Sequence, residues 1–145
     1  MAMILKSTIE FTVDMPVYPE RFYRAWLDSF EHAQFTGQPA EIQPQTGGIF
    51  LALNGKVESR LTRLVAHSLI EQSWKVEGFP LDEDSHISLT IQPTCMGCEV
   101  RLRHSGVPVT LNKTLLSWWE EQYFWPMRAY FEASVGDYVA DMGDG

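Results

Sequence analysis

The chain has 145 residues, of which 45% are hydrophobic and 21% charged, and its formal net charge at pH 7 is -8. A chain of this length is typical of one domain and buries roughly 68–70% of the surface that its unfolded form exposes. Nucleic acids and anionic membranes are bound chiefly through Lys and Arg, so the acidic balance argues against both partners. We therefore expect a single domain over residues 1–145.

The cysteine count and the apolar stretches indicate a compartment. Two cysteines, Cys95 and Cys98, are too few for the disulfide framework of a small secreted domain. The N-terminal residues lack a basic stretch followed by a long apolar run, and no uncharged apolar stretch approaches the ~20 residues of a transmembrane helix. These features predict a cytoplasmic protein without membrane insertion.

The first part of the chain predicts a strand followed by two short helices. Within residues 4–13 apolar and polar residues alternate, which is typical of a half-buried strand. A helix is expected from Pro19, because proline suits the first helical turn and aromatic residues then recur at helical spacing. Asp28 and Glu31 resemble a capping box and predict a second helix that ends at Thr36 and the glycine after it.

The middle of the chain predicts an antiparallel sheet. From residue 47 to residue 104, Gly, Pro and Asn separate short runs of alternating apolar and polar residues. The connections between these runs are mostly of hairpin length. The expected strands are residues 48–53, 57–65, 69–76, 85–92 and 98–104.

The last helix is expected from residue 111 to about residue 135, with an acidic tail over 136–145 that we expect to fray. Seven aromatic rings on most of its faces indicate that it lies deep against a curved surface, around a cavity. Pro126 removes one helical hydrogen bond, and a fixed kink that fits the sheet is favoured over a bend that admits a ligand. The seven aromatic residues are Trp118, Trp119, Tyr123, Phe124, Trp125, Tyr130 and Phe131.

This order of elements predicts how the layers pack. The sheet can bury one face only against the helices. At ~1.5 Å per residue, a 25-residue helix is roughly 37 Å long, which is enough to follow the whole concave face of such a sheet. We therefore predict an α+β helix-grip fold. In it, a curved antiparallel sheet of about six or seven strands wraps around the long C-terminal helix, and two short helices follow the first strand.

Six stretches, taken in order, carry a resemblance to a known family. With them the chain resembles the START-like, or SRPBCC, superfamily, and within it the homologues of the activator of the heat-shock-protein-90 ATPase. The stretches are residues 19–28 (PERFYRAWLD), 35–37 (FTG), 47–50 (GGIF), 70–75 (IEQSWK), 104–108 (HSGVP) and 118–126 (WWEEQYFWP). Residues 57–60 (VESR) depart from the family, whose members often have a glycine there.

The resemblance implies a hydrophobic cavity between the sheet and the long helix, in which relatives bind lipids, polyketides, hormones or other apolar molecules. It implies no cofactor and no particular reaction. The family name also implies a chaperone-associated or stress-response role, and some relatives of the superfamily are cyclases or hydrolases.

Two sets of residues have side chains of the kinds found in metal or redox sites. Cys95 and Cys98 have the spacing of a disulfide or half a zinc site, but they fall in an expected hairpin turn and no second ligand pair is present, which favours two turn-flanking cysteines. The histidines lack ligand spacing, so no metal site is predicted. They are His32, His67, His86 and His104.

Strand parity places polar residues on the apolar face of the sheet. Gln72, His104 and the pair Ser59 and Arg63 share parity with apolar neighbours, and a few polar groups in an apolar wall suit a small-molecule site. In the alternative, Gln72 bonds a neighbour, His104 lies at a strand end and Arg63 leaves the face through a β-bulge.

The aromatic residues Trp74, Trp118, Tyr123 and Trp125 either wall a pocket or form plain core. With Gln72 and His104 as orienting groups, these six are the candidate ligand-binding residues. We find no paired carboxylates, no nucleophile with a base and no phosphate-binding loop on the expected inner face, so no catalytic residue is predicted.

The leading hypothesis is therefore a noncatalytic protein that binds an apolar or amphipathic small molecule, lipid-like or polyketide-like, in a cavity of roughly 300 Å³ or more. A chaperone-associated interaction protein would instead have a filled core and an exposed apolar patch. An enzyme of the cyclase or hydrolase kind would have a strongly perturbed titratable group inside the cavity. The oligomeric state is left open.

Overall fold

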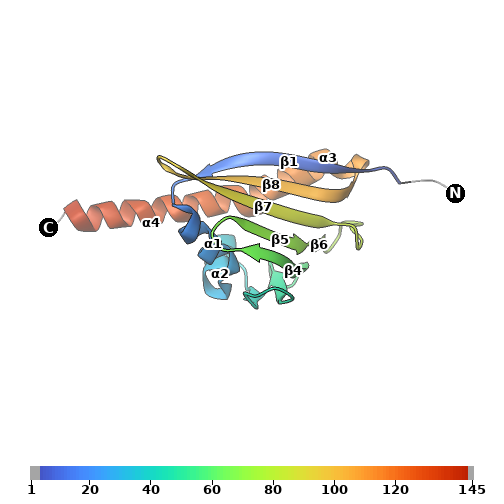
Figure 1. Cartoon of the computed structure of the whole chain (residues 1–145), viewed down its shortest axis with the longest axis horizontal. Coiled ribbons are helices and arrows are strands. Elements are labelled where there is room, and N and C mark those ends of the chain that lie inside the picture. Colours follow the sequence, from blue (N-terminus) through green and yellow to red (C-terminus); the bar gives the residue numbers. More distant parts are fainter. Residues whose placement is uncertain (1–3, 144–145) are drawn as a thin grey trace.

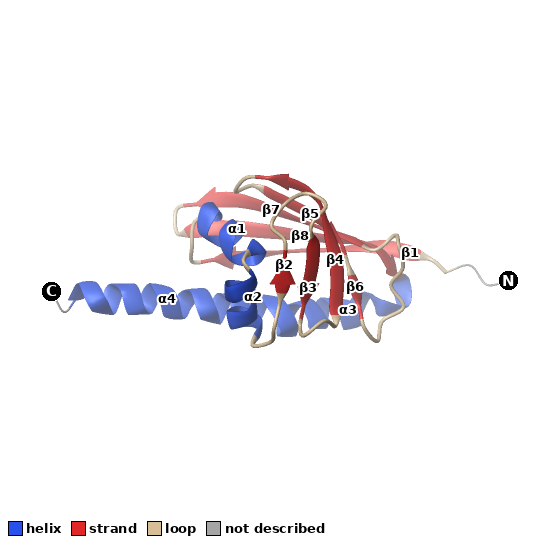
Figure 2. Cartoon of the chain, turned by 90° about the horizontal axis from the view of Figure 1, so that it is seen from below, coloured by secondary structure: helices blue, strands red, loops and turns tan. Residues whose placement is uncertain are grey.

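The computed structural model of the protein describes residues 4–143, and it describes side chains as far as Ser134. A strand, two short helices, further strands and a long helical segment follow one another along the chain. Figures 1 and 2 show the strands forming one curved sheet, with the long helical segment along one side and α2 (Ser29–Thr36) beside that segment. This is the α+β helix-grip fold that the sequence predicts.

In the described part of the chain the sheet has eight antiparallel strands, in the order β1-β8-β7-β5-β4-β3-β2, with β6 paired to β4. The strands are β1 (Lys6–Met15), β2 (Glu41–Ile42), β3 (Ile49–Ala52), β4 (Val57–Val65), β5 (Leu69–Ser73), β6 (Lys75–Val76), β7 (His86–Thr94) and β8 (Gly97–Pro108).

The sheet has more strands than the sequence predicts, for two reasons. The two-residue strand β2 is too short to show any alternation. The strand expected over residues 69–76 is interrupted at Trp74, whose backbone N–H donates to the Ser85 carbonyl at 2.9 Å instead of joining the ladder with β4. Trp74 therefore lies at a break in the sheet.

The inner face of the sheet follows strand parity in β8 but not along all of β4. His104 is buried on the same face as Val100 and Leu102. In β4, the register with β5 shifts between Leu61 and Arg63, and Arg63 is exposed and pairs with Glu71. The alternative in which Arg63 leaves the inner face is thus confirmed, because a β-bulge changes the parity of the strand.

Of the two helices after β1, the first begins at the predicted proline and the second begins and ends where its capping residues predict. Helix α1 spans Pro19–Leu27, and α2 begins after Asp28, whose carboxylate accepts a hydrogen bond from the Glu31 N–H at 2.8 Å. Gly37 ends α2 with φ 75°, a left-handed conformation that glycine adopts without steric cost.

Replacing Asp28 by alanine should lower the free energy of unfolding by about 1 kcal/mol, because the Glu31 N–H at the start of α2 loses its acceptor. The Asp28→Asn variant retains an acceptor and serves as the control. Urea unfolding followed by circular dichroism measures both. Equal losses in the two variants would contradict a capping role for the Asp28 side chain.

The long helical segment is continuous but irregular. A 3₁₀ turn (Val109–Leu111) precedes α3 (Asn112–Trp119), a π-helical segment η2 (Glu120–Phe124) follows, and α4 (Trp125–Gly143) completes it. The π-helical segment ends two residues before Pro126, which has no N–H to donate. The side chains of the predicted tail, residues 136–145, lie outside the described residues.

Within the described residues, none of the helices has both the length and the apolar composition that a membrane-spanning helix needs.

Candidate ligand site

The structure brings five of the six candidate ligand-binding residues to the interior between the sheet and the helical segment. Gln72, Trp74, His104 and Tyr123 are fully buried, and Trp118 is half-buried. Trp125 lies apart, with 60% of its surface exposed. It follows Tyr123 by two positions, which at about 100° per residue places it nearly opposite on the helix.

Aromatic rings fill the interior at the place where the sequence predicts a cavity. The ring of Trp74 stacks on Trp119 at a centroid distance of 4.8 Å, and Trp26 approaches Tyr123 at 5.1 Å. Every ring of this group has another of its rings within 6.3 Å. We call these six residues the aromatic cluster: Trp26, Phe50, Trp74, Trp118, Trp119 and Tyr123.

Sequence reasoning did not select Trp26 or Trp119 as site residues, although each joins a candidate polar residue to the cluster. Trp26 Nε1 donates to Gln72 Oε1 at 2.9 Å, and Gln72 Nε2 donates to Ser59 Oγ at 2.7 Å. Gln72 is therefore bonded on both sides inside the protein. The helical spacing of Trp26 was the available signal, but spacing alone does not name the partner.

His104 is held between the helical segment and the loop before β7. Trp119 Nε1 donates to His104 Nδ1 at 3.1 Å, so the ring proton lies on Nε2, which donates to Ser85 Oγ at 2.8 Å. Burial, and to a smaller extent the nearby His86, lower the pKa of His104 to about 4. The ring is therefore neutral at pH 7.

His32 is likewise buried and hydrogen-bonded through both ring nitrogens. Its Nδ1–H donates to the Trp26 carbonyl at 2.8 Å, and its Nε2 accepts from the Tyr123 hydroxyl at 2.9 Å. Burial lowers the pKa of His32 to about 4, and it also raises the pKa of Tyr123 well above its usual value. Both nitrogens of each buried histidine are engaged internally, so these perturbed groups are structural in this arrangement.

The indole N–H of Trp74 is the exception to this pattern. Trp74 is fully buried, and among the described residues its Nε1 is the one buried side-chain nitrogen or oxygen atom without a hydrogen-bond partner. Buried donors are rarely left unpaired, because the lost hydrogen bond to water is not replaced. Trp74 therefore offers a free donor inside the aromatic cluster.

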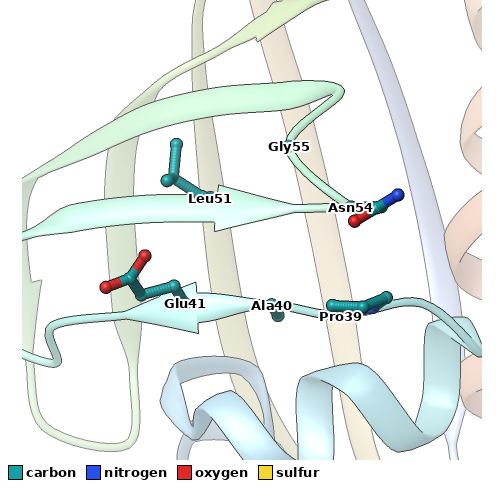
Figure 3. Close-up of a pocket in the computed structure, with 6 residues that line it drawn as sticks. All are labelled: Pro39, Ala40, Glu41, Leu51, Asn54 and Gly55. Carbon is teal, nitrogen blue, oxygen red and sulfur yellow. The ribbon is translucent and has the colours of Figure 1, made fainter.

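Two hollows on the surface of the protein are lined by residues outside the aromatic cluster. One, of about 280 Å³, lies between β2 and the β3–β4 turn, and its lining residues include Glu41, Leu51 and Asn54 (Figure 3). Another, of about 480 Å³, lies beside the β7–β8 turn and includes the exposed Cys95. Cys98 is buried, and burial raises its pKa to about 11.

Comparisons with known proteins identify the family and the fold of this chain. A family model described as "Activator of Hsp90 ATPase homolog 1-like protein" matches residues 16–132. The human protein "Activator of 90 kDa heat shock protein ATPase homolog 1" is 26% identical over 106 residues, which cover 73% of this chain and 31% of that protein. The chain thus spans about a third of the length of the curated relatives it matches.

Two solved structures share the fold. An HSP90 activator from Plasmodium falciparum superposes with a TM-score of 0.71 at 20% identity, covering 89% of this chain and 96% of that one. DynU16, described as a putative protein in the dynemicin biosynthetic locus, has a TM-score of 0.74 at 14% identity and covers 88% of this chain and 48% of that one. Because the family model spans most of the chain and the fold agrees, the protein belongs to the Activator of Hsp90 ATPase homolog 1-like family and has the START-like fold.

Proposed function

We propose that the protein binds an apolar or amphipathic small molecule at the aromatic cluster, between the sheet and the helical segment. The observation that carries this proposal is the irregular helical wall over the cluster. Tyr123 belongs to the π-helical segment η2, and Pro126 is the second residue of α4, which continues from η2. Such segments are frequent at functional sites, because their hydrogen bonds are less regular than those of an α-helix.

The aromatic rings are close together, so a ligand must displace one of them to enter. Trp118 is the member of the aromatic cluster that reaches the surface. Its ring packs edge-on against Trp74, with centroids 6.1 Å apart. Movement of Trp118 toward solvent would expose the ring of Trp74 to an incoming molecule. We therefore propose Trp118 as the entry to the site, with Trp74 and Tyr123 behind it.

Gln72 and His104 would border the same ligand, but as supports of the cluster rather than as free polar groups. Each is bonded to a tryptophan of the cluster, Gln72 to Trp26 and His104 to Trp119. Trp125 is not part of this proposal, because its ring is on the outer face of α4.

The fluorescent probe 1-aminoanthracene tests this proposal. We expect it to bind with one molecule per chain, and we expect Trp118→Ala to raise its association rate on the order of tenfold, because the ring that must move is removed. Stopped-flow fluorescence measures the rate, and native mass spectrometry measures the stoichiometry. Trp125→Ala is the matched control and should leave the rate unchanged. An equal effect of both variants, or no binding, would refute the proposed site.

Family membership favours a second candidate function, contact with a 90 kDa heat-shock chaperone, and the ring-filled interior is what we expect of such an interaction protein. The exposed Trp125 lies on the outer face of α4, with Glu121 one turn before it and Arg128, which pairs with Glu132 at 3.2 Å, one turn after it. This face would therefore offer an apolar ring between charges of both signs to a partner surface with an apolar pocket. Stimulation of the chaperone ATPase by the wild-type protein, lost in Trp125→Ala and kept in Trp118→Ala, would support this function. Unchanged ATPase activity would count against it.

A further inference from the structure

The unpaired indole N–H of Trp74 favours a ligand that carries a hydrogen-bond acceptor. The side chain is fully buried, and its Nε1 has no partner among the described residues. The ring is fixed by its neighbours, since it stacks on Trp119 at 4.8 Å and meets Tyr123 at 5.7 Å. The donor therefore cannot easily turn toward solvent, and an acceptor has to come to it.

The other buried donors of the cluster are already in use. Trp26 Nε1 is bonded to Gln72, Trp119 Nε1 to His104, and the Tyr123 hydroxyl to His32. A ligand that carries an acceptor would thus find its donor in Trp74 without breaking a bond inside the protein.

The charge of the interior excludes an ionic ligand. Among the described residues, the buried polar side chains are His32, Gln72, Ser85 and His104, and they include no Asp, Glu, Lys or Arg. Both histidines are held neutral by their burial. A buried carboxylate or ammonium group on a ligand would have no counter-charge, and burying an unpaired charge is very costly.

The orientations of the rings also indicate the shape of the ligand that would fit among them. Trp74 is inclined by 27° to Trp26 and by 26° to Trp119, so the Trp74 indole is roughly parallel to each of these two neighbours. Trp118 crosses Trp74 at 73° and Trp119 at 86°. A molecule that takes the place of the Trp118 ring would make the same edge-to-face contacts, which flat aromatic rings make well.

We infer that the site takes a neutral, flat aromatic molecule whose carbonyl or ether oxygen accepts the Trp74 Nε1–H. This rests on the proposed ligand binding at the aromatic cluster and adds the class of ligand. A fatty acid or another anionic lipid would have to keep its charged group outside this interior, which offers no counter-charge.

Three probes with one ring frame test the inference: 9-fluorenone, fluorene and fluorene-9-carboxylate. We expect 9-fluorenone to bind about tenfold more tightly than fluorene, because only the ketone accepts from Trp74, and we expect the carboxylate to bind most weakly. In Trp74→Phe, the affinity for 9-fluorenone should fall to that for fluorene, whereas fluorene itself should bind as in the wild type. Trp125→Phe is the matched control and should keep the preference.

A measurement on the wild-type protein covers the case in which Trp74→Phe fails to fold. The chain has five tryptophans, so its ¹⁵N–¹H spectrum contains five indole signals that can be assigned. We expect 9-fluorenone, but not fluorene, to move the Trp74 indole proton downfield, as a new hydrogen bond does. An unmoved Trp74 signal with 9-fluorenone bound would overturn the inference.

The failures of the two proposals are distinguishable. Equal affinities for fluorene and 9-fluorenone, or tightest binding of the carboxylate, would overturn the ligand class while leaving ligand binding in place. Binding of none of these probes would overturn both.

Discussion

Replacing Trp26 by alanine should lower the free energy of unfolding by about 3–5 kcal/mol, the largest effect that we expect of any single substitution. The ring is fully buried on α1 and packs against His32 at 5.0 Å and Phe50 at 5.8 Å. Its removal leaves a large void and also leaves Gln72 Oε1 without its donor. Because domains are stable by about 5–15 kcal/mol, this variant should be close to unfolding. Urea denaturation followed by far-ultraviolet circular dichroism measures the change.

The matched control for Trp26→Ala is Trp125→Ala, which removes the same side chain from the surface. With 60% of Trp125 exposed, its loss should change the free energy of unfolding by no more than about 0.5 kcal/mol. Similar effects of the two substitutions would contradict the aromatic cluster as the centre of the core.

Acid should destabilise the protein through His32 and His104 between about pH 6.5 and pH 4. Both histidines have a folded-state pKa of about 4 because of burial, against an ordinary value of 6.5 in the unfolded chain. In this window the unfolded chain binds protons that the folded protein does not, so the free energy of unfolding falls as the pH falls. Below about pH 4 both states are protonated, and these two groups add no further loss.

The expected loss is about 2 kcal/mol for each of these histidines between pH 7 and pH 5. Urea unfolding at several pH values measures it. His104→Gln should remove about half of this pH dependence, whatever its effect on stability at pH 7. His67→Asn is the control, because His67 is exposed with φ 64° and asparagine tolerates that conformation. The prediction fails if His104→Gln and the wild type lose the same free energy between pH 7 and pH 5.

Local patterns explain why much of the fold could be predicted from the sequence. The cap at Asp28, the end of α2 at Gly37 and the strand β4 (Val57–Val65) lie where the sequence places them. Each of these features depends on residues within a few positions of one another. Periodicity is less informative where an element is two residues long, as in β2, or where a strand bulges, as at Arg63.

The candidate site was predicted less completely than the fold. Gln72, Trp74, His104 and Tyr123 are buried together as their spacing indicates, whereas Trp125 is exposed. When several aromatic residues are neighbours on one helix, their sequence does not tell which rings face inward. In addition, the π-helical segment η2 changes the angular spacing of the residues that follow it. His32 was passed over because a single histidine on a short helix gives no sign of its partner.

The sequence by itself determined the order of the elements, the antiparallel sheet and the α+β helix-grip fold, because apolar periodicity and capping residues act over a few neighbouring positions. Only the tertiary structure decided which polar groups are satisfied. Gln72 bonds Trp26 across 46 positions of the chain, and His32 bonds Tyr123 across 91. Partners so far apart meet only after the helices pack on the sheet. The same packing pairs the other indole donors of the interior and leaves that of Trp74 free.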